Sequence, residues 1–348
     1  AAPIILNIIL IGSLFFSQWV NIPNVKILAY AVSFAGILQF ILLLFFVKKN
    51  FKPILSLKIK INKKIKFFFS KLLPSIFSSG VTQINILIGT IIASFQAGAV
   101  SYLYYADRVY QINLAVAGIA VGTVMLPELS KYVKTNDFEK ITNLQNRALE
   151  LCLFLSIPAA IALVLASNQI ITSLFGYGSF DNESVINTAL ALTYFAIGVP
   201  AFSILKIFSN FFFARNDTKT PFYLSVVSVI LNIAISISFF GRFGFVIIPI
   251  ATSISSWLNV LMYYYFIKRR NLHTFDSKFI YKLPRIILSV VVMGILLHLL
   301  LGFFSDKFNY NESWKFIYLF IIVTLSLISY FIISNFSGAF KFKDIKLR

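Results

Sequence analysis

The chain has 348 residues, of which 59% are apolar and only 12% charged, and its mean hydropathy is +0.86. A soluble domain carries about a quarter of its residues charged, so this composition excludes an ordinary water-soluble protein. The net charge of +19 does not indicate nucleic-acid binding, because the basic residues gather in short segments between apolar runs, and the single cysteine, Cys152, excludes a disulfide framework and a thiolate metal site.

Ten apolar runs, each near or above the length that a tilted helix needs to cross a bilayer, follow one another along the chain. They cover roughly residues 3–18, 26–47, 69–95, 100–130, 148–167, 187–213, 221–240, 245–267, 283–304 and 314–335. None has the short alternating pattern of barrel strands, and backbone groups inside the hydrocarbon must be satisfied internally. The sequence therefore predicts an all-α polytopic membrane protein with about ten transmembrane helices.

The start of the chain lies directly in an apolar run. It reads Ala1-Ala2-Pro3, without an initiator methionine, a basic segment before the run or a small-residue cleavage site. A secretory signal peptide would need the last two features. We therefore interpret the chain as a fragment or a trimmed protein.

The segments between the runs differ in charge. Those after the second, fourth, sixth, eighth and tenth runs hold, with their flanks, 25 of the lysines and arginines, whereas the segments on the other side hold four. Cytoplasmic loops carry the excess of lysine and arginine. The first set is therefore predicted to be cytoplasmic, and with it the C-terminus.

Polar residues form a stripe on the third run, because several of them are three or four positions apart. They are Ser75, Ser78, Ser79, Thr82, Gln83 and Asn85. Such a stripe either lines a wet cavity or holds helices together by hydrogen bonds within the membrane. Gln83 and Asn85 are therefore candidate substrate-binding residues.

Two basic residues, Arg108 in the fourth run and Lys206 in the sixth, are left over from the count of loop charges and should sit well within the hydrocarbon. A charge near the bilayer centre costs at least about 2.5–3.5 kcal/mol, so it usually faces a bundle interior and marks a substrate path. The structural alternative for Arg108 is an ion pair with Asp107. Lys206 lies nearer an interface, where a lysine can extend its ammonium to water.

No catalytic constellation emerges from the sequence. The carboxylates are few, and none forms a pair at a spacing suited to acid–base or metal chemistry. We expect no enzyme activity, no metal site and no cofactor.

Motifs within residues 74–134 and 214–221 make the interpretation specific. They are Pro74-Ser75-Ile76, Gln83-Ile84-Asn85, Ala93-Ser94-Phe95, Ser101-Tyr-Leu-Tyr-Tyr-Ala-Asp-Arg108, Gly122-Thr-Val-Met-Leu-Pro-Glu-Leu-Ser-Lys131 and Ala214-Arg-Asn-Asp-Thr-Lys-Thr-Pro221. In order and spacing these motifs resemble the MurJ/MviN family of lipid II flippases, which belong to the multidrug/oligosaccharidyl-lipid/polysaccharide exporter superfamily.

The resemblance implies a MATE-like architecture of two lobes plus a C-terminal helix pair, of which this chain would begin at the fifth helix. Residues 1–50 would then be the last two helices of the N-terminal lobe and 51–68 a basic cytoplasmic linker. Residues 69–270 would be a six-helix C-terminal lobe, and 271–348 the appended pair with a basic tail.

The resemblance also implies site residues. The essential arginine of the family's Tyr-Tyr-Ala-Asp-Arg segment matches Arg108, with Asp107 before it. The family often has a glutamate where this chain has Gln111, and its basic residue in the helix before the Arg-x-Asp loop matches Lys206. These four residues complete the candidate substrate-binding set with Gln83 and Asn85.

By resemblance, the protein would flip lipid II or a related polyprenyl-pyrophosphate lipid across the bacterial inner membrane by alternating access, with membrane lipids and a coupling ion as further partners. Another superfamily member, such as an O-antigen flippase or a cation-coupled drug exporter, is the nearest alternative. Exporters would be expected to have a membrane-embedded carboxylate, and only Asp107 lies deep. A membrane transferase would need clustered aspartates or a nucleophile with its base, and a passive scaffold would have no use for Arg108.

Overall fold

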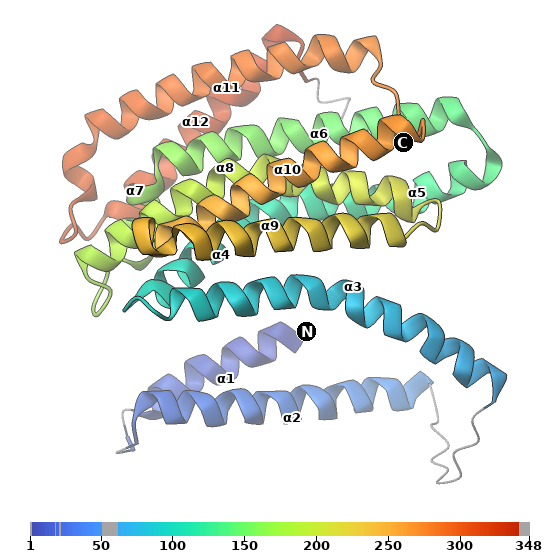
Figure 1. The fold of residues 1–348 in the computed structure, drawn as a ribbon. Helices are drawn as coiled ribbons and strands as arrows, with labels where there is room; N and C mark the ends of the chain where they lie inside the picture. The colour runs from blue at the N-terminus through green and yellow to red at the C-terminus, as the bar shows by residue number, and fades with distance from the viewer. Residues whose placement is uncertain (1, 18, 21, 51–61, 341–348) are drawn as a thin grey trace. The chain divides into compact units, whose positions relative to one another are not determined.

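The computed structural model describes residues 2–17, 19–20, 22–50 and 62–340, and every regular element in them is helical (Figure 1). The elements are α1 (Ala2–Ser17), α2 (Asn24–Asn50), α3 (Lys63–Ala93), α4 (Ala99–Leu114), the π-helix η1 (Ala115–Ala120), α5 (Val121–Thr135), α6 (Phe138–Leu165), α7 (Ser167–Phe175), α8 (Asn182–Phe213), α9 (Lys219–Phe243), the 3₁₀ turn η2 (Gly244–Val246), α10 (Ile247–Arg269), α11 (Ser277–Phe303), the 3₁₀ turn η3 (Ser305–Phe308) and α12 (Lys315–Ser337).

The predicted all-α fold and the number of crossings are confirmed. Within the described residues, seven stretches are long and apolar enough to cross a membrane, and two shorter apolar helices cover Ile4–Ser17 and Gln83–Ala93. One of the seven, Lys219–Arg269, contains both α9 and α10, which the η2 turn separates. With α9 and α10 counted separately and the two shorter helices added, the described residues hold ten apolar helical segments. Elements α4, η1 and α5 form one continuous rod, which is the single long run predicted at 100–130.

The chain divides into two compact units, residues 1–70 and 71–348. In the first unit, α1 and α2 pack against each other. The small side chains of Ala31 and Ala35 on α2 are buried, whereas most of its larger apolar residues are exposed. Small residues at a contact allow membrane helices to approach closely. Of the predicted linker 51–68, residues 51–61 lie outside the described residues and α3 begins at Lys63.

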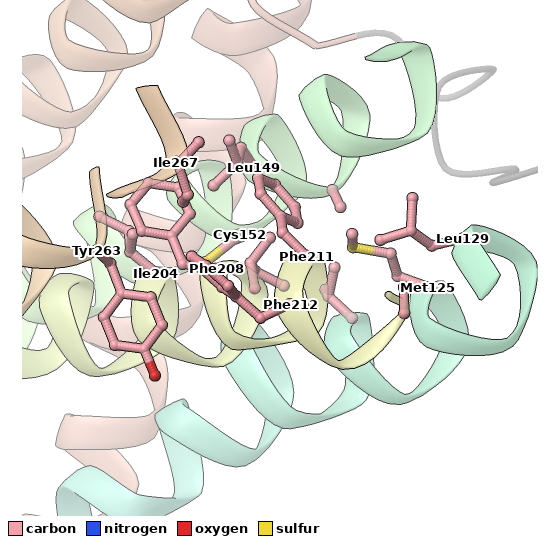
Figure 2. Close-up of a cluster of buried hydrophobic side chains, with 14 of the residues drawn as sticks. Met125, Leu129, Leu149, Cys152, Ile204, Phe208, Phe211, Phe212, Tyr263 and Ile267 are labelled. Atoms are coloured by element: carbon pink, nitrogen blue, oxygen red, sulfur yellow. The ribbon is translucent and has the colours of Figure 1, made fainter. Parts of the chain in front are cut away.

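Helix α8 is the centre of the second unit, because it packs against α4, α6 and α10 along its length (Figure 1). One core cluster joins α5, α6, α8 and α10, and Figure 2 shows it: Met125, Leu129, Leu149, Cys152, Ile204, Phe208, Phe211, Phe212, Tyr263 and Ile267. Cys152 is a buried free thiol within this cluster. A second cluster towards the other end joins α4, α8 and α10 through residues such as Val109, Leu192 and Ile248.

Helices α11 and α12 pack against each other, and α11 packs on α6. Phe154 of α6 stacks on Phe340 at 4.2 Å between ring centroids, and its carbonyl accepts a hydrogen bond from the Tyr330 hydroxyl at 2.7 Å. Helices α11 and α12 correspond to the helix pair within residues 271–348 that we expect to be appended to the C-terminal lobe. The basic tail 341–348 lies outside the described residues.

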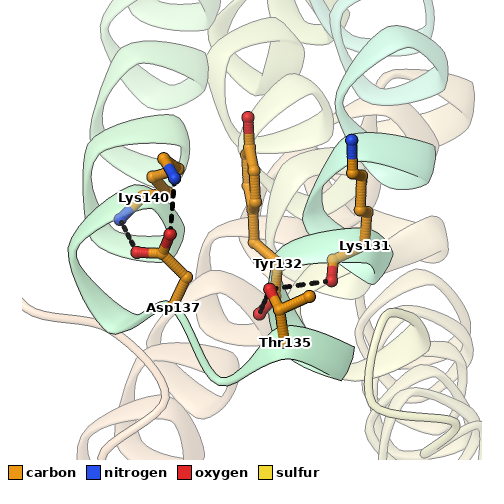
Figure 3. Close-up of polar contacts among 5 residues, drawn as sticks. All are labelled: Lys131, Tyr132, Thr135, Asp137 and Lys140. Atoms are coloured by element: carbon orange, nitrogen blue, oxygen red, sulfur yellow. Dashed lines mark hydrogen bonds and ion pairs between the residues drawn. The ribbon is translucent and has the colours of Figure 1, made fainter.

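The turns 136–137, 214–218 and 270–276 lie at one end of the second unit, which is the predicted cytoplasmic end and is called the basic end below. Each turn contains an asparagine at positive φ: Asn136, Asn216 and Asn271. Asparagine tolerates this left-handed conformation and therefore ends helices well. Figure 3 shows the first turn, in which Asp137 caps α6 by accepting from the Lys140 backbone N–H at 3.2 Å and pairs with its ammonium at 2.7 Å.

Candidate functional site

Arg108 lies in the α4 part of the rod, on the surface of the second unit. Its guanidinium carbon is 4.7 Å from the centre of the Tyr104 ring, one helical turn back. Within the described residues it forms no salt bridge and donates no side-chain hydrogen bond. The planar guanidinium therefore stacks on a ring and lies near the Asp107 charge without a hydrogen bond to it, so its N–H donors remain available to a ligand.

Asp107 does not pair with Arg108. Its carboxylate accepts a hydrogen bond from the side-chain amide of Gln111, four residues on, and the Tyr110 hydroxyl also interacts with it. Neighbouring residues on a helix point about 100° apart, which explains why adjacent opposite charges find different partners. Asp107 and Gln111 therefore bind each other, and Arg108 takes no part in this hydrogen bond.

Lys206 of α8 lies beside η1. Its Cγ would be 3.4 Å from a Cβ placed on Gly118, and its side chain is exposed. Its ammonium has no hydrogen bond or ion pair among the described residues. Gly118 lies ten residues after Arg108, so the stem of Lys206 meets the rod about 15 Å further along, at 1.5 Å per residue. The two cations therefore stand at different depths rather than in one cluster.

Gln83 and Asn85 lie on α3, and among the described residues neither forms a hydrogen bond with Arg108 or Lys206. The Gln83 side chain is exposed. Asn85 is half-buried, and its Oδ1 is buried without a hydrogen-bond partner among the described residues. The side chains of the other four members of the predicted stripe, Ser75, Ser78, Ser79 and Thr82, lie outside the described residues.

Asn210 was not predicted, although it faces the same rod. It is buried on α8, and its Nδ2 donates to the Gly122 carbonyl at 2.7 Å, across 88 residues of sequence. The signal for it was present, because an asparagine within an apolar run needs an internal partner. The partner could not be found from sequence, because it is a backbone carbonyl on a distant segment.

An apolar cavity of about 330 Å³ is lined by three segments. These are η1 with the start of α5, the middle of α6, and the C-terminal part of α12 with the residues that follow it. Its walls include Val116, Val124, Leu155, Phe331 and Phe340, and none of its lining residues is polar. It opens beside the stretch of the rod that carries Gly118. This cavity was not predicted, because its walls come from three segments far apart in the chain.

Lys315, one of the four basic residues counted on the predicted outer side, is fully buried at the start of α12. Its ammonium donates to the carbonyls of Gly176 at 2.6 Å and Tyr310 at 2.8 Å, and it lies 4.0 Å from the centre of the Tyr177 ring. It therefore ties α12 to the turn between α7 and α8.

The titratable groups outside the spans offer no second centre. Among the described residues, no three His, Cys, Asp or Glu side chains gather as metal ligands would. His273, in the turn before α11, has its Nδ1 3.0 Å from Gln145 Oε1, and burial lowers the pKa of its imidazole from 6.5 to about 4. Arg270 pairs with Asp217 at 2.6 Å across two neighbouring turns.

The second unit is a bundle of membrane-crossing helices with Arg108 on the rod and Lys206 on α8 beside it, an architecture that it shares with solved structures of polytopic membrane transporters. A MATE transporter in the straight conformation superimposes on 76% of this chain and 63% of its own, with a TM-score of 0.51 at 17% identity, which establishes the fold alone. A lipid II flippase MurJ in an inward closed conformation matches 96% of this chain and 67% of its own, with a TM-score of 0.74 and 27% identity.

The family profile of the lipid II flippase MurJ matches residues 1–320, and the chain belongs to this family. The probable lipid II flippase MurJ of Rhizobium meliloti is 35% identical over 85% of this chain and 56% of its own length. That of Rickettsia prowazekii is 33% identical over 89% of this chain and 61% of its own length. The chain thus spans little more than half the length of these relatives, and the predicted family and fold are confirmed.

Proposed function

We propose that this chain is part of a transporter that flips lipid II across the bacterial inner membrane by alternating access. The substrate head would enter from the basic end, which we assign to the cytoplasm, and leave at the other. The proposal rests on membership of the flippase family and on the chemistry of the rod. Its basic turns and C-terminus would face the cytoplasm.

Arg108 is the observation that carries the proposal. A guanidinium makes two parallel hydrogen bonds to a phosphate, and these are strong in a poorly solvated cleft. Arg108 lies inside a crossing segment, is exposed on the lobe surface and has no ionic partner among the described residues. An arginine at this depth without a partner is expensive unless a ligand provides one.

Lys206 supports the same path at a second depth. A pyrophosphate that moves along the rod would meet Lys206 nearer the basic end and Arg108 about 15 Å further on, since Gly118 and Arg108 are ten residues apart. Two cations placed one after the other along a path lower the free-energy cost of moving an anion through the protein, and neither of them needs to bind the anion so tightly that it stays. Asp107 and Gln111 lie next to Arg108 and would meet the sugar or peptide part, and Gln83 and Asn85 are the corresponding candidates on α3.

The apolar cavity fits the other part of such a substrate. A polyprenyl tail needs an apolar surface that opens to the bilayer, and the walls between α5, α6 and α12 are wholly apolar. The head would then travel along the rod while the tail stays in contact with lipid. We infer transport without covalent chemistry and without a cofactor, with membrane lipids and a coupling ion as further partners.

The test uses the complete reading frame that contains this chain, purified and reconstituted into vesicles. Fluorescent lipid II in one leaflet should become accessible to a quencher in the other much faster than in vesicles without protein. An O-antigen-type polyprenyl lipid and a cationic drug are assayed beside it. Faster movement of either of these, with lipid II unmoved, would replace the proposal by the corresponding superfamily function.

A further inference from the structure

Two glycines of the rod face α8 at close range. Gly118 and Gly122 are four residues apart and so lie on one face of the rod. A Cβ on Gly118 would lie 3.0 Å from the Ser203 Cα, and a Cβ on Gly122 would lie 3.0 Å from Asn210 Nδ2. Both distances are shorter than ordinary contacts allow. A larger residue at either position would push α8 or the Asn210 side chain away by a few tenths of an ångström, and these two glycines are called the glycine strip below.

Asn210 fixes the register of α8 on the glycine strip. Its buried amide donates to the Gly122 carbonyl at 2.7 Å, directly after the π-helical turn η1. Hydrogen bonds weaken steeply beyond about 3.5 Å. A slide of one helical turn moves a helix by about 5.4 Å, so a slide of that size would break the bond. Breaking it would leave a buried donor unpaired, which is unfavourable.

Lys206 lies one turn before Asn210 and is seated on the same strip. Its Cγ would be 3.4 Å from a Cβ on Gly118, and its carbonyl oxygen 3.7 Å from a Cβ on Gly122. The aliphatic stem therefore lies across the strip while the ammonium remains free of partners among the described residues. Whatever holds α8 on the strip also sets the depth at which this charge stands.

We propose that Asn210 is a positioning residue for Lys206. Its bond to the Gly122 carbonyl holds α8 on the glycine strip and thereby places the ammonium of Lys206 on the path of an anionic lipid head. The inference rests on the proposed function, because the place of this ammonium matters to transport only when it meets the phosphates. Gly118 serves the same end by leaving room for the lysine stem.

The rival explanation is that Asn210 only joins two helices, as polar residues often do in membranes. The two explanations differ in how Asn210 and Lys206 combine. A residue that acts through Lys206 has no further effect once Lys206 is gone, whereas independent structural effects add. A double-mutant cycle therefore separates them.

The cycle measures lipid II flipping and membrane level for Asn210→Ala, Lys206→Ala and the double variant in the complete reading frame. We expect Asn210→Ala to slow flipping on the order of tenfold, the effect of one buried hydrogen bond, and the double variant to equal Lys206→Ala. The inference would be overturned if Asn210→Ala slowed flipping equally with Lys206 present and with Lys206→Ala. It would also be overturned if Asn210→Ala did not slow flipping when Lys206 is present. Where Asn210→Ala fails to reach the membrane, Asn210→Leu, which has a side chain of similar shape and no donor, replaces it.

A second readout does not depend on transport. Lys206→Cys in a Cys152→Ala background is labelled with a methanethiosulfonate reagent, with and without Asn210→Ala or Gly118→Ala. Both variants should change the labelling rate at least severalfold, whereas Gly302→Ala should not, because a Cβ there meets no atom within 4 Å. Unchanged rates in both variants would show that the strip does not place residue 206. Failure of wild-type flipping would count against the proposed function and leave this result intact.

Discussion

Asp107 and Arg108 are adjacent in the chain, yet each binds a partner one helical turn away in opposite directions. The carboxylate takes the Gln111 amide four residues ahead, and the guanidinium stacks on the Tyr104 ring four residues behind. The two charges are therefore satisfied separately. An ion pair between them, the structural alternative considered for Arg108, is not formed.

This separation predicts the behaviour of Arg108 variants. Arg108→Ala should abolish flipping while membrane level and thermal unfolding remain close to wild type, because no buried carboxylate loses its partner. Arg108→Lys should restore only part of the activity, since an ammonium keeps the charge but cannot form the bidentate bond. The measurements are vesicle flipping and the amount of protein in the membrane.

The double variant Asp107→Ala with Arg108→Ala is the control. Were the arginine structural, its loss would lower protein level and removal of the carboxylate would restore it. Recovery of transport in the double variant would contradict a phosphate-binding role, because a neutral surface cannot replace a phosphate ligand.

The orientation of the chain is testable with single cysteines in a Cys152→Ala background. Cysteines at Asn182 and Asn309, at the end opposite the basic turns, should react with an impermeant thiol reagent in intact cells, and one at Asn62 should not. Labelling at Asn62 without permeabilisation would reverse the assignment of the cytoplasmic side and, with it, the direction of transport.

The sequence was sufficient for the fold because hydrocarbon imposes one rule on every crossing segment, namely that it be long, apolar and helical. The crossings were countable for that reason. The π-helix η1 and the short α7 were not predictable. A π-helical turn has no composition of its own and depends on packing against α8, and α7 is too short for a hydropathy window to separate from its neighbours.

Site residues could be predicted where their residue type is unusual at that depth in the membrane. They could not be predicted where their role depends on a contact with a distant segment. Arg108 and Lys206 were found because charges are rare in apolar runs. Asn210 and Lys315 were not, because their partners are backbone carbonyls of distant segments. Every residue has a backbone carbonyl, so the sequence does not indicate which one will accept a hydrogen bond.

Lys315 should be important for stability rather than for transport chemistry. Lys315→Met would leave the carbonyls of Gly176 and Tyr310 without this donor, at roughly 1–3 kcal/mol for each buried group left unpaired. Thermal unfolding in detergent should therefore begin at a clearly lower temperature. Lys307→Met, at an exposed lysine nearby, is the matched control and should leave the transition in place. Equal transitions for the two variants would contradict the anchoring role.

His273 should make stability depend on pH. Burial lowers the pKa of its imidazole from 6.5 to about 4, with Asp276 opposing the shift and Arg215 adding to it. Between these values the unfolded chain binds a proton that the folded protein does not, so stability falls as the pH is lowered from about 6.5 towards 4. His273→Phe, which keeps a ring beside Phe211 and Phe275, should lose less stability between pH 7 and pH 5 than the wild type. Parallel losses in denaturant titrations would refute this.

The last prediction concerns whether α11 moves with α6 during transport. A Cβ on Gly294 of α11 would lie 3.3 Å from Ile161 Cγ2 of α6, which is close enough for a disulfide between cysteines at the two positions. The Glu150 and Lys282 side chains join the same two helices by a salt bridge of 2.6 Å. A polar anchor and close packing on one pair of helices favour joint movement.

In a Cys152→Ala background, Gly294→Cys with Ile161→Cys should therefore form a disulfide under mild oxidation and continue to flip lipid II at a similar rate. Gly302→Cys with Ile161→Cys is the control that should not cross-link, because Gly302 has no neighbour within 4 Å of its Cβ position. Loss of flipping on oxidation of the first pair, with recovery after reduction, would show instead that α11 slides on α6. The appended helices would then be a moving part of the transport cycle rather than a fixed extension of the lobe.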